Sequence, residues 1–171
     1  MKAPTPARQL KGFLDRYTPE VGGVARAALA RMRRLVPGAV ELVYDNYNAL
    51  VIGFGPTERA SDALFSIALY PRWVSLFFLQ GARLSDPEKL LKGGGKRVRH
   101  IVLEEAAVLD RPGVRKLITQ ALTTAVTPID RGGHRRMIIK SISPKQRARR
   151  PPAGASARGG QGTIRAKEKQ P

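Results

Sequence analysis

The chain has 171 residues, of which 42% are hydrophobic, carries a formal net charge of +18 and contains no cysteine. This length and composition predict one domain with a hydrophobic core and appended tails, and the lack of cysteine excludes disulfides, thiolate metal sites and cysteine nucleophiles. No apolar run reaches the roughly 18 residues that a membrane span needs and no signal-peptide core follows the basic N-terminus, so we expect a cytoplasmic protein that does not enter a membrane.

The first part of the chain predicts a disordered arm followed by two helices. Residues 1–8 contain two prolines and little to bury, so we expect them to be disordered. The apolar residues of 9–17 follow helical spacing, which predicts a short amphipathic helix. The second helix is predicted to begin with Thr18 as its N-cap and Pro19 as its first residue, and to end at Pro37-Gly38.

Short apolar segments joined by turns predict a sheet in the middle of the chain. The predicted strands cover 40–45, 48–54, 63–70, 73–79 and 98–103. Strands that follow each other through short turns pair in antiparallel fashion. With the helices, this order predicts an α+β two-layer sandwich, an antiparallel sheet of about five strands with helices packed on one face.

Two further helices are predicted after the first four strands. Ser85-Asp86-Pro87-Glu88 is typical of a helix start and predicts a short helix over 87–91. Asp110 is predicted to cap a final helix that runs from Pro112 to about Thr124.

A triple glycine, Gly93–Gly95, precedes a basic stretch that includes Lys96 and Arg99. A Walker phosphate loop has the pattern GxxxxGK[ST] between a strand and a helix, and this segment has neither the spacing nor the order. Two interpretations stay open. The glycines could end a helix at positive φ, or their backbone N–H groups could form a nest for an anion, with Lys96 in contact with it and Arg99 assisting.

Most aromatic residues alternate with aliphatic ones in the predicted strands, which favours core filling over an exposed platform for nucleic acid. Tyr44, Tyr47 and Trp73 adjoin polar turns, and we expect them to line a groove. Together with Lys96 and Arg99 they form the candidate ligand-binding site, with the three rings as its apolar wall. The serines, histidines and carboxylates show no catalytic or metal-binding spacing. The sequence therefore predicts a non-enzymatic module, without catalytic residues, metal ligands or cofactor, that binds a small anionic ligand or a protein partner.

Positive charge is concentrated near the C-terminus. From Arg131 onward the chain has 12 lysines and arginines and one acid, Glu168, so this part has a net charge of +11. We predict a domain over 9–130 and a mostly disordered basic tail over 131–171, in which Met137–Ile139 is a short apolar segment that could add a last strand. Such a tail could bind nucleic acid without sequence specificity through phosphate contacts, or it could serve only to keep the protein in solution.

The run from Tyr44 to Leu103 resembles the YdhG-like domain family, a group of frataxin-like bacterial proteins. The resemblance covers roughly residues 10–125 and rests on a tyrosine-bearing first hairpin and on the segments Leu76-Phe77-Phe78, Gly81-Ala82-Arg83-Leu84, Asp86-Pro87 with Leu90-Leu91, Gly93–Lys96 and Arg99-His100-Ile101. It implies a small antiparallel α+β sandwich. It also implies, through one branch of the family, an intracellular iron chaperone with iron as its cargo.

Overall fold

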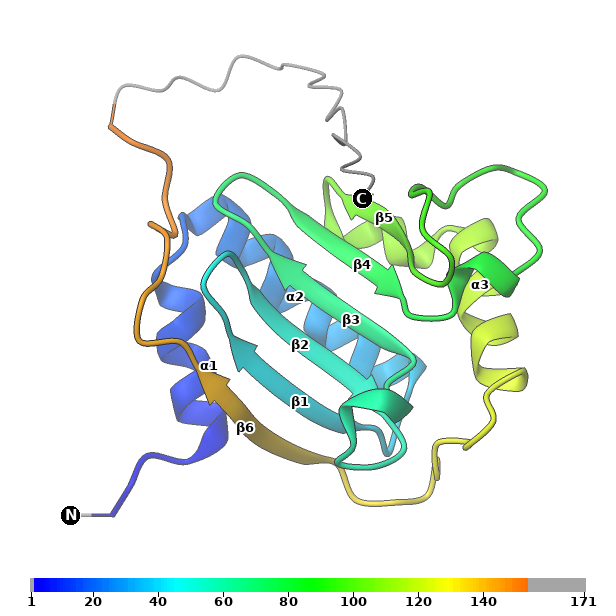
Figure 1. Cartoon of the computed structure of the whole chain (residues 1–171), viewed down its shortest axis with the longest axis horizontal. Helices are drawn as coiled ribbons and strands as arrows, with labels where there is room; N and C mark the ends of the chain where they lie inside the picture. The colour runs from blue at the N-terminus through cyan, green and yellow to red at the C-terminus, as the bar shows by residue number, and fades with distance from the viewer. Residues whose placement is uncertain (1, 154–171) are drawn as a thin grey trace, which may run out of the picture.

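The computed structural model describes residues 2–153, which form three α-helices, three short 3-10 helices and one six-stranded sheet (Figure 1). The α-helices are α1 (Pro6–Asp15), α2 (Pro19–Leu35) and α3 (Pro112–Thr123). The strands are β1 (Val40–Asp45), β2 (Leu50–Gly55), β3 (Phe65–Leu69), β4 (Val74–Phe78), β5 (Arg99–Leu103) and β6 (Arg136–Ile142). The 3-10 helices are η1 (Ala60–Asp62), η2 (Gly81–Arg83) and η3 (Ala106–Asp110).

The sheet has the order β5-β4-β3-β2-β1-β6. The first five strands pair as an antiparallel meander, and β6 joins the free edge of β1 in parallel orientation. Figure 1 shows α1 and α2 behind this sheet, on one of its faces. The predicted α+β two-layer sandwich is therefore confirmed, with six strands instead of about five.

The core lies between α2 and the inner face of the sheet. Alternate strand residues such as Val43, Ile52 and Leu76 point to the same face and are fully buried. Ala25 and Ala28 of α2 are equally buried, and their small side chains let the helix approach the strands closely. This packing holds the strand ends, where the turns lie, at fixed positions.

Both N-terminal helices begin with a threonine followed by a proline. Thr18 caps α2 as predicted, since its Oγ1 accepts a hydrogen bond from the backbone N–H of Val21. Thr5 does the same for α1, with Pro6 as the first helical residue. The prediction that residues 1–8 are disordered is thus wrong from Thr5 onward, because the Thr5-Pro6 pair is the helix-start signal that identified α2.

The predicted helix over 87–91 is absent. Residues after Asp86 instead form a turn in which the Asp86 carboxylate accepts hydrogen bonds from the backbone N–H groups of Leu90 (2.9 Å) and Leu91 (2.8 Å). Lys89 has φ +54°, which is incompatible with a continuous helix. The aspartate thus closes a loop rather than capping a helix, and the helix-end interpretation of Gly93–Gly95 is wrong.

The start of α3 also differs from the prediction. Arg111, not Asp110, occupies the N-cap position, and no side chain caps this helix. Asp110 ends η3 and accepts hydrogen bonds from Arg31 and Arg115. Its carboxylate is used to join α2 to α3.

The C-terminal prediction needs the largest correction. The prediction of a mostly disordered tail over 131–171 is wrong for β6, which pairs with β1 from Arg136 to Ile142 with one register shift between Val43 and Tyr44. Met137 and Ile139 alternate toward the core and are partly buried against it, and the backbone N–H of Ser143 donates to the carbonyl oxygen of Asp45 (2.8 Å). The domain therefore extends past the predicted boundary at residue 130, whereas the part of the predicted tail over 154–171 lies outside the described residues.

Tyr17 links α1 to the sheet, and its hydroxyl gives a first testable prediction. The side chain is 2% exposed, and its hydroxyl donates to the carbonyl oxygen of Leu69 and accepts from the N–H of Leu50, both at 3.1 Å. Tyr17→Phe leaves both buried backbone groups without this partner, so we expect a loss of about 1–3 kcal/mol in the free energy of unfolding. Urea denaturation followed by circular dichroism measures it. Tyr47→Phe, at an exposed ring, is the control, and equal midpoints for the two variants would contradict the assigned role.

Candidate functional site

An open hollow of about 800 Å³ lies at one end of the strands. Its walls come from the β1–β2 turn, the β3–β4 turn and the segment that follows β6, three parts that meet at the upper left in Figure 1. We call it the aromatic hollow. It is lined by Asn46, Tyr47, Asn48, Ala49, Tyr70, Pro71, Trp73, Ser143, Arg147 and Ala148. This volume is within the range of small-molecule sites.

Two aromatic rings of the hollow are exposed to solvent. Tyr47 is 48% exposed and Trp73 is 38% exposed. The Trp73 ring stacks on Tyr70, with 4.7 Å between centroids and an interplanar angle of 21°. Burial raises the pKa of the Tyr70 hydroxyl, so this phenol stays neutral at physiological pH and can both donate and accept a hydrogen bond. The rings are thus held in place by neighbours while part of their surface stays open.

Arg147 brings a positive charge to the same hollow. Its guanidinium carbon lies 5.6 Å from the centroid of the Tyr47 ring, a cation–π distance. The backbone N–H of Arg147 also donates to the carbonyl oxygen of Tyr47 (2.9 Å). The segment after β6 is therefore fixed to the β1–β2 turn.

A buried carboxylate holds that segment. Asp45, at the end of β1, is 1% exposed and accepts from Arg149 Nη2 at 2.9 Å and from Arg16 Nη1 at 3.1 Å. Arg149 is itself buried, and its guanidinium lies 5.7 Å from the ring of Tyr17. We call Asp45, Arg16 and Arg149 the Asp45 clasp. It fixes the wall of the hollow that carries Arg147.

Glu41 repeats this arrangement at the other end of β1. The carboxylate is fully buried and binds the guanidinium of Arg33 from α2, with a shortest distance of 2.8 Å. Arg135, just before β6, reaches the same carboxylate at 3.3 Å. Each inner carboxylate of β1 thus binds one arginine from the helical N-terminal part of the chain and one from the C-terminal part. This explains why so basic a segment folds onto the domain.

Two of the five predicted site residues, Tyr47 and Trp73, come together in the hollow. Tyr44 does not join them, because it lies on the outer face of the sheet, paired with Val51 and Ser141. Its hydroxyl is buried, has no hydrogen-bond partner among residues 2–153, and has its pKa raised by burial.

Lys96 and Arg99 lie at the other end of the sheet. Arg99 pairs with Phe78, whereas Val74, next to Trp73, pairs with Leu103. Along β4 the two pairs are four positions apart, about 13 Å at roughly 3.3 Å per residue. The Arg99 guanidinium is turned to the loop and donates to the carbonyl oxygens of Gly95 and Val98. The predicted grouping of Lys96 and Arg99 with the aromatic wall is therefore wrong.

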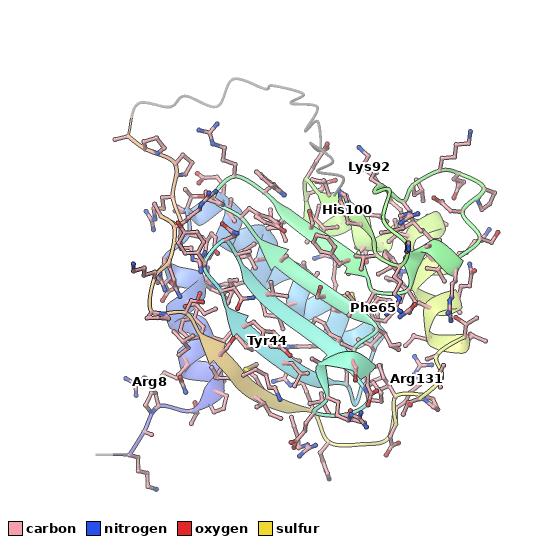
Figure 2. All side chains as sticks on the ribbon, viewed as in Figure 1. Arg8, Tyr44, Phe65, Lys92, His100 and Arg131 are labelled. Atoms are coloured by element: carbon pink, nitrogen blue, oxygen red, sulfur yellow. The ribbon has the colours of Figure 1, made fainter. Side chains whose placement is uncertain are left out.

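The loop before β5 has its own geometry. Lys92 and His100 exchange both backbone hydrogen bonds at 2.9 Å and lie side by side (Figure 2), so the triple glycine forms the tip of a loop closed by this pair. Arg97 lines a second hollow of about 570 Å³ together with Arg83 and Val126. This second hollow is at the opposite strand ends from the aromatic hollow.

Sequence reasoning missed Tyr70 and Arg147. Tyr70 precedes the Pro71 turn and so satisfies the criterion that selected Trp73, adjacency to a turn. Arg147 had no such signal, because its segment has the composition of a disordered tail and acquires its position through long-range contacts with Asp45 and the turn that follows it.

Among residues 2–153, no group of three or more histidine, aspartate or glutamate side chains could hold a metal ion. In the same residues, no helix has the length and the apolar character needed to cross a membrane.

Comparison of the chain with protein-family models, with curated proteins and with solved structures finds no match. The resemblance to the YdhG-like family thus stays a prediction from the motifs alone.

Proposed function

We propose that the protein is a non-enzymatic, cytoplasmic binding module and that the aromatic hollow is its ligand-binding site. The observation that carries the proposal is that two exposed rings, Tyr47 and Trp73, share one hollow with the cation Arg147. Exposed aromatic rings next to a fixed arginine suit a ligand that combines a planar ring with an anionic group. The ring stacks on the aromatic side chains, and the anion pairs with the guanidinium.

The polar lining supports binding rather than catalysis. The described lining residues contain no carboxylate and no histidine that could serve as a general base. Asn46 and Asn48 are exposed amides that can each donate and accept hydrogen bonds to a ring edge. These groups select and orient a ligand.

A function in which the basic tail alone binds nucleic acid has less support than ligand binding at the aromatic hollow. Of the eight lysines and arginines in 131–150, most contact acceptors or rings of the same chain, among them Arg135, Arg136, Arg149 and Arg150. The four basic residues after 153 lie outside the described part. An iron-carrying function rests on the family resemblance alone.

Trp73 is the only tryptophan of the chain, so its fluorescence reports on the hollow directly. We expect adenosine 5′-monophosphate, used as a probe with ring and phosphate, to quench this fluorescence in a saturable way, and adenosine to bind more weakly. Tyr47→Leu removes one ring and is expected to weaken binding by about tenfold, since stacking on an aromatic side chain contributes about 1–3 kcal/mol per base. Lys96→Gln, at the other end of the sheet, is the control. Quenching that is not saturable, or that is the same in the Tyr47→Leu variant, would exclude the hollow as the site.

A further inference from the structure

Three exposed cations, Arg72, Lys145 and Arg147, lie within or next to the segments that line the aromatic hollow. Arg72 stands between the lining residues Pro71 and Trp73, and Lys145 belongs to the segment that supplies Ser143 and Arg147 to the wall. Within residues 2–153, none of these three cations, Arg72, Lys145 and Arg147, forms an ion pair. Arg72 belongs to the β3–β4 turn, whereas Lys145 and Arg147 belong to the segment after β6, so positive charge comes from two segments that line the hollow.

The aromatic hollow has no exposed carboxylate among its described lining residues to offset these cations. Asp45 is the acid closest in sequence to the lining, and it is buried and bound by two arginines. No aspartate or glutamate is among the described lining residues. The rim of the hollow therefore presents uncompensated positive charge to a ligand that is larger than the hollow.

Each exposed ring is supported on one side by a neighbour. Tyr70 stacks against Trp73, and the Arg147 guanidinium lies over Tyr47. The supporting contacts fix the rings while about half of Tyr47 and a third of Trp73 remain exposed. Two fixed rings in one hollow suit unstacked bases, and a base of a duplex is not accessible to such rings because it is already stacked and paired.

From this we infer that the ligand of the aromatic hollow is a single-stranded nucleic acid, whose base stacks on Tyr47 or Trp73 while neighbouring phosphates contact Arg72, Lys145 and Arg147. The inference rests on the proposed function and specifies its ligand class. An acidic polypeptide would satisfy the cations but would leave the rings without planar partners. The exposed aromatic area therefore favours bases.

The test uses the full chain and a fluorescein-labelled 12-nucleotide oligothymidylate, with binding followed by anisotropy. We expect it to bind at least tenfold more tightly than thymidine monophosphate and more tightly than the corresponding duplex. A single-stranded ligand shows a slope of log affinity against log salt of about −0.7 for each phosphate contact. Arg147→Gln or Lys145→Gln is thus expected to reduce the slope by about 0.7.

Two variants separate rings from charge. Tyr47→Leu is expected to lower affinity about tenfold while the salt slope stays the same, since this ring carries no charge. Arg97→Gln removes one positive charge, as Arg147→Gln does, but at the opposite end of the sheet. It is expected to change affinity for the oligonucleotide less than twofold. Oligouridylate in place of oligothymidylate tells whether RNA or DNA is preferred.

The outcomes are distinct. If the mononucleotide binds in a Tyr47-dependent way but the oligonucleotide binds no more tightly, the inference fails and the proposed function stands. If neither ligand depends on Tyr47, both fail. The inference is overturned if the duplex binds as tightly as the single strand, or if polyglutamate competes as strongly as unlabelled oligonucleotide. It is also overturned if deletion of 154–171 abolishes binding while Tyr47→Leu leaves it unchanged.

Discussion

Asp45→Ala will lower the free energy of unfolding by about 3–5 kcal/mol, the cost of removing one partner from a buried ion pair. The variant leaves Arg149, which is 4% exposed, as a buried charge without its carboxylate. It also frees the segment after β6, which the Asp45 clasp fixes to the end of β1. Urea denaturation followed by circular dichroism gives the free energy directly.

A matched set of variants separates this effect from a general loss of charge pairs. Lys11→Ala breaks an exposed pair with Asp15 in α1 and should leave the denaturation midpoint unchanged. The double replacement Asp45→Leu and Arg149→Met should recover most of the loss, since a buried pair can be exchanged for apolar residues at little cost. A loss below about 1 kcal/mol in Asp45→Ala would show that water replaces the arginine contacts, contrary to the buried geometry.

Gly38→Ala has the second largest expected effect. Gly38 has φ +81°, a conformation that costs a residue with a side chain roughly 1–2 kcal/mol. In addition, a Cβ atom would lie 2.0 Å from the carbonyl oxygen of Asp130, a backbone atom that cannot rotate away. The loop that leads into β6 must then shift, so we expect a loss well above the conformational cost alone.

Gly23→Ala is the matched control for this second prediction. Gly23 lies in α2, and among residues 2–153 no atom outside its chain neighbours and the backbone of its own helix would lie within 4 Å of an added Cβ. Because alanine is the better helix former, this variant should be more stable than the original chain by about 0.5–1 kcal/mol. Glycine to alanine is thus expected to lower the free energy of unfolding at Gly38 and to raise it at Gly23. A Gly38→Ala variant as stable as the original chain would contradict the close approach of Asp130.

Local signals in the sequence predicted much of the fold. The Thr18-Pro19 start of α2 and the bounds of β1 agree with the structure, because capping and strand propensity act within a few residues. The prediction of a helix after Asp86 is wrong, since the same aspartate can cap a helix or close a loop. In the structure it closes a loop from which Leu90 packs against the core.

The candidate site was less predictable, for reasons of distance along the chain. Adjacency to turns identified Tyr47 and Trp73 correctly as neighbours of a hollow. Lys96 and Arg99 were grouped with them, but the pairing of β4 with β5 places these cations at the other strand ends. The position of Arg147 depends on the contact between Arg149 and the carboxylate of Asp45, which lies 104 residues earlier in the chain. A local sequence pattern cannot reveal such a contact.

The position of β6 has a consequence for synthesis on the ribosome. β1 can pair with β2 as soon as the hairpin of these two strands has been synthesised. The other edge of β1 stays unpaired until residues 136–142 have been synthesised. Until then an open edge is exposed to pairing with other chains, and Glu41 and Asp45 each lack one of their arginines. We therefore expect the domain to reach its stable form only after β6 and Arg149 have left the exit tunnel, because both are needed to complete the edge of β1 and to pair Asp45.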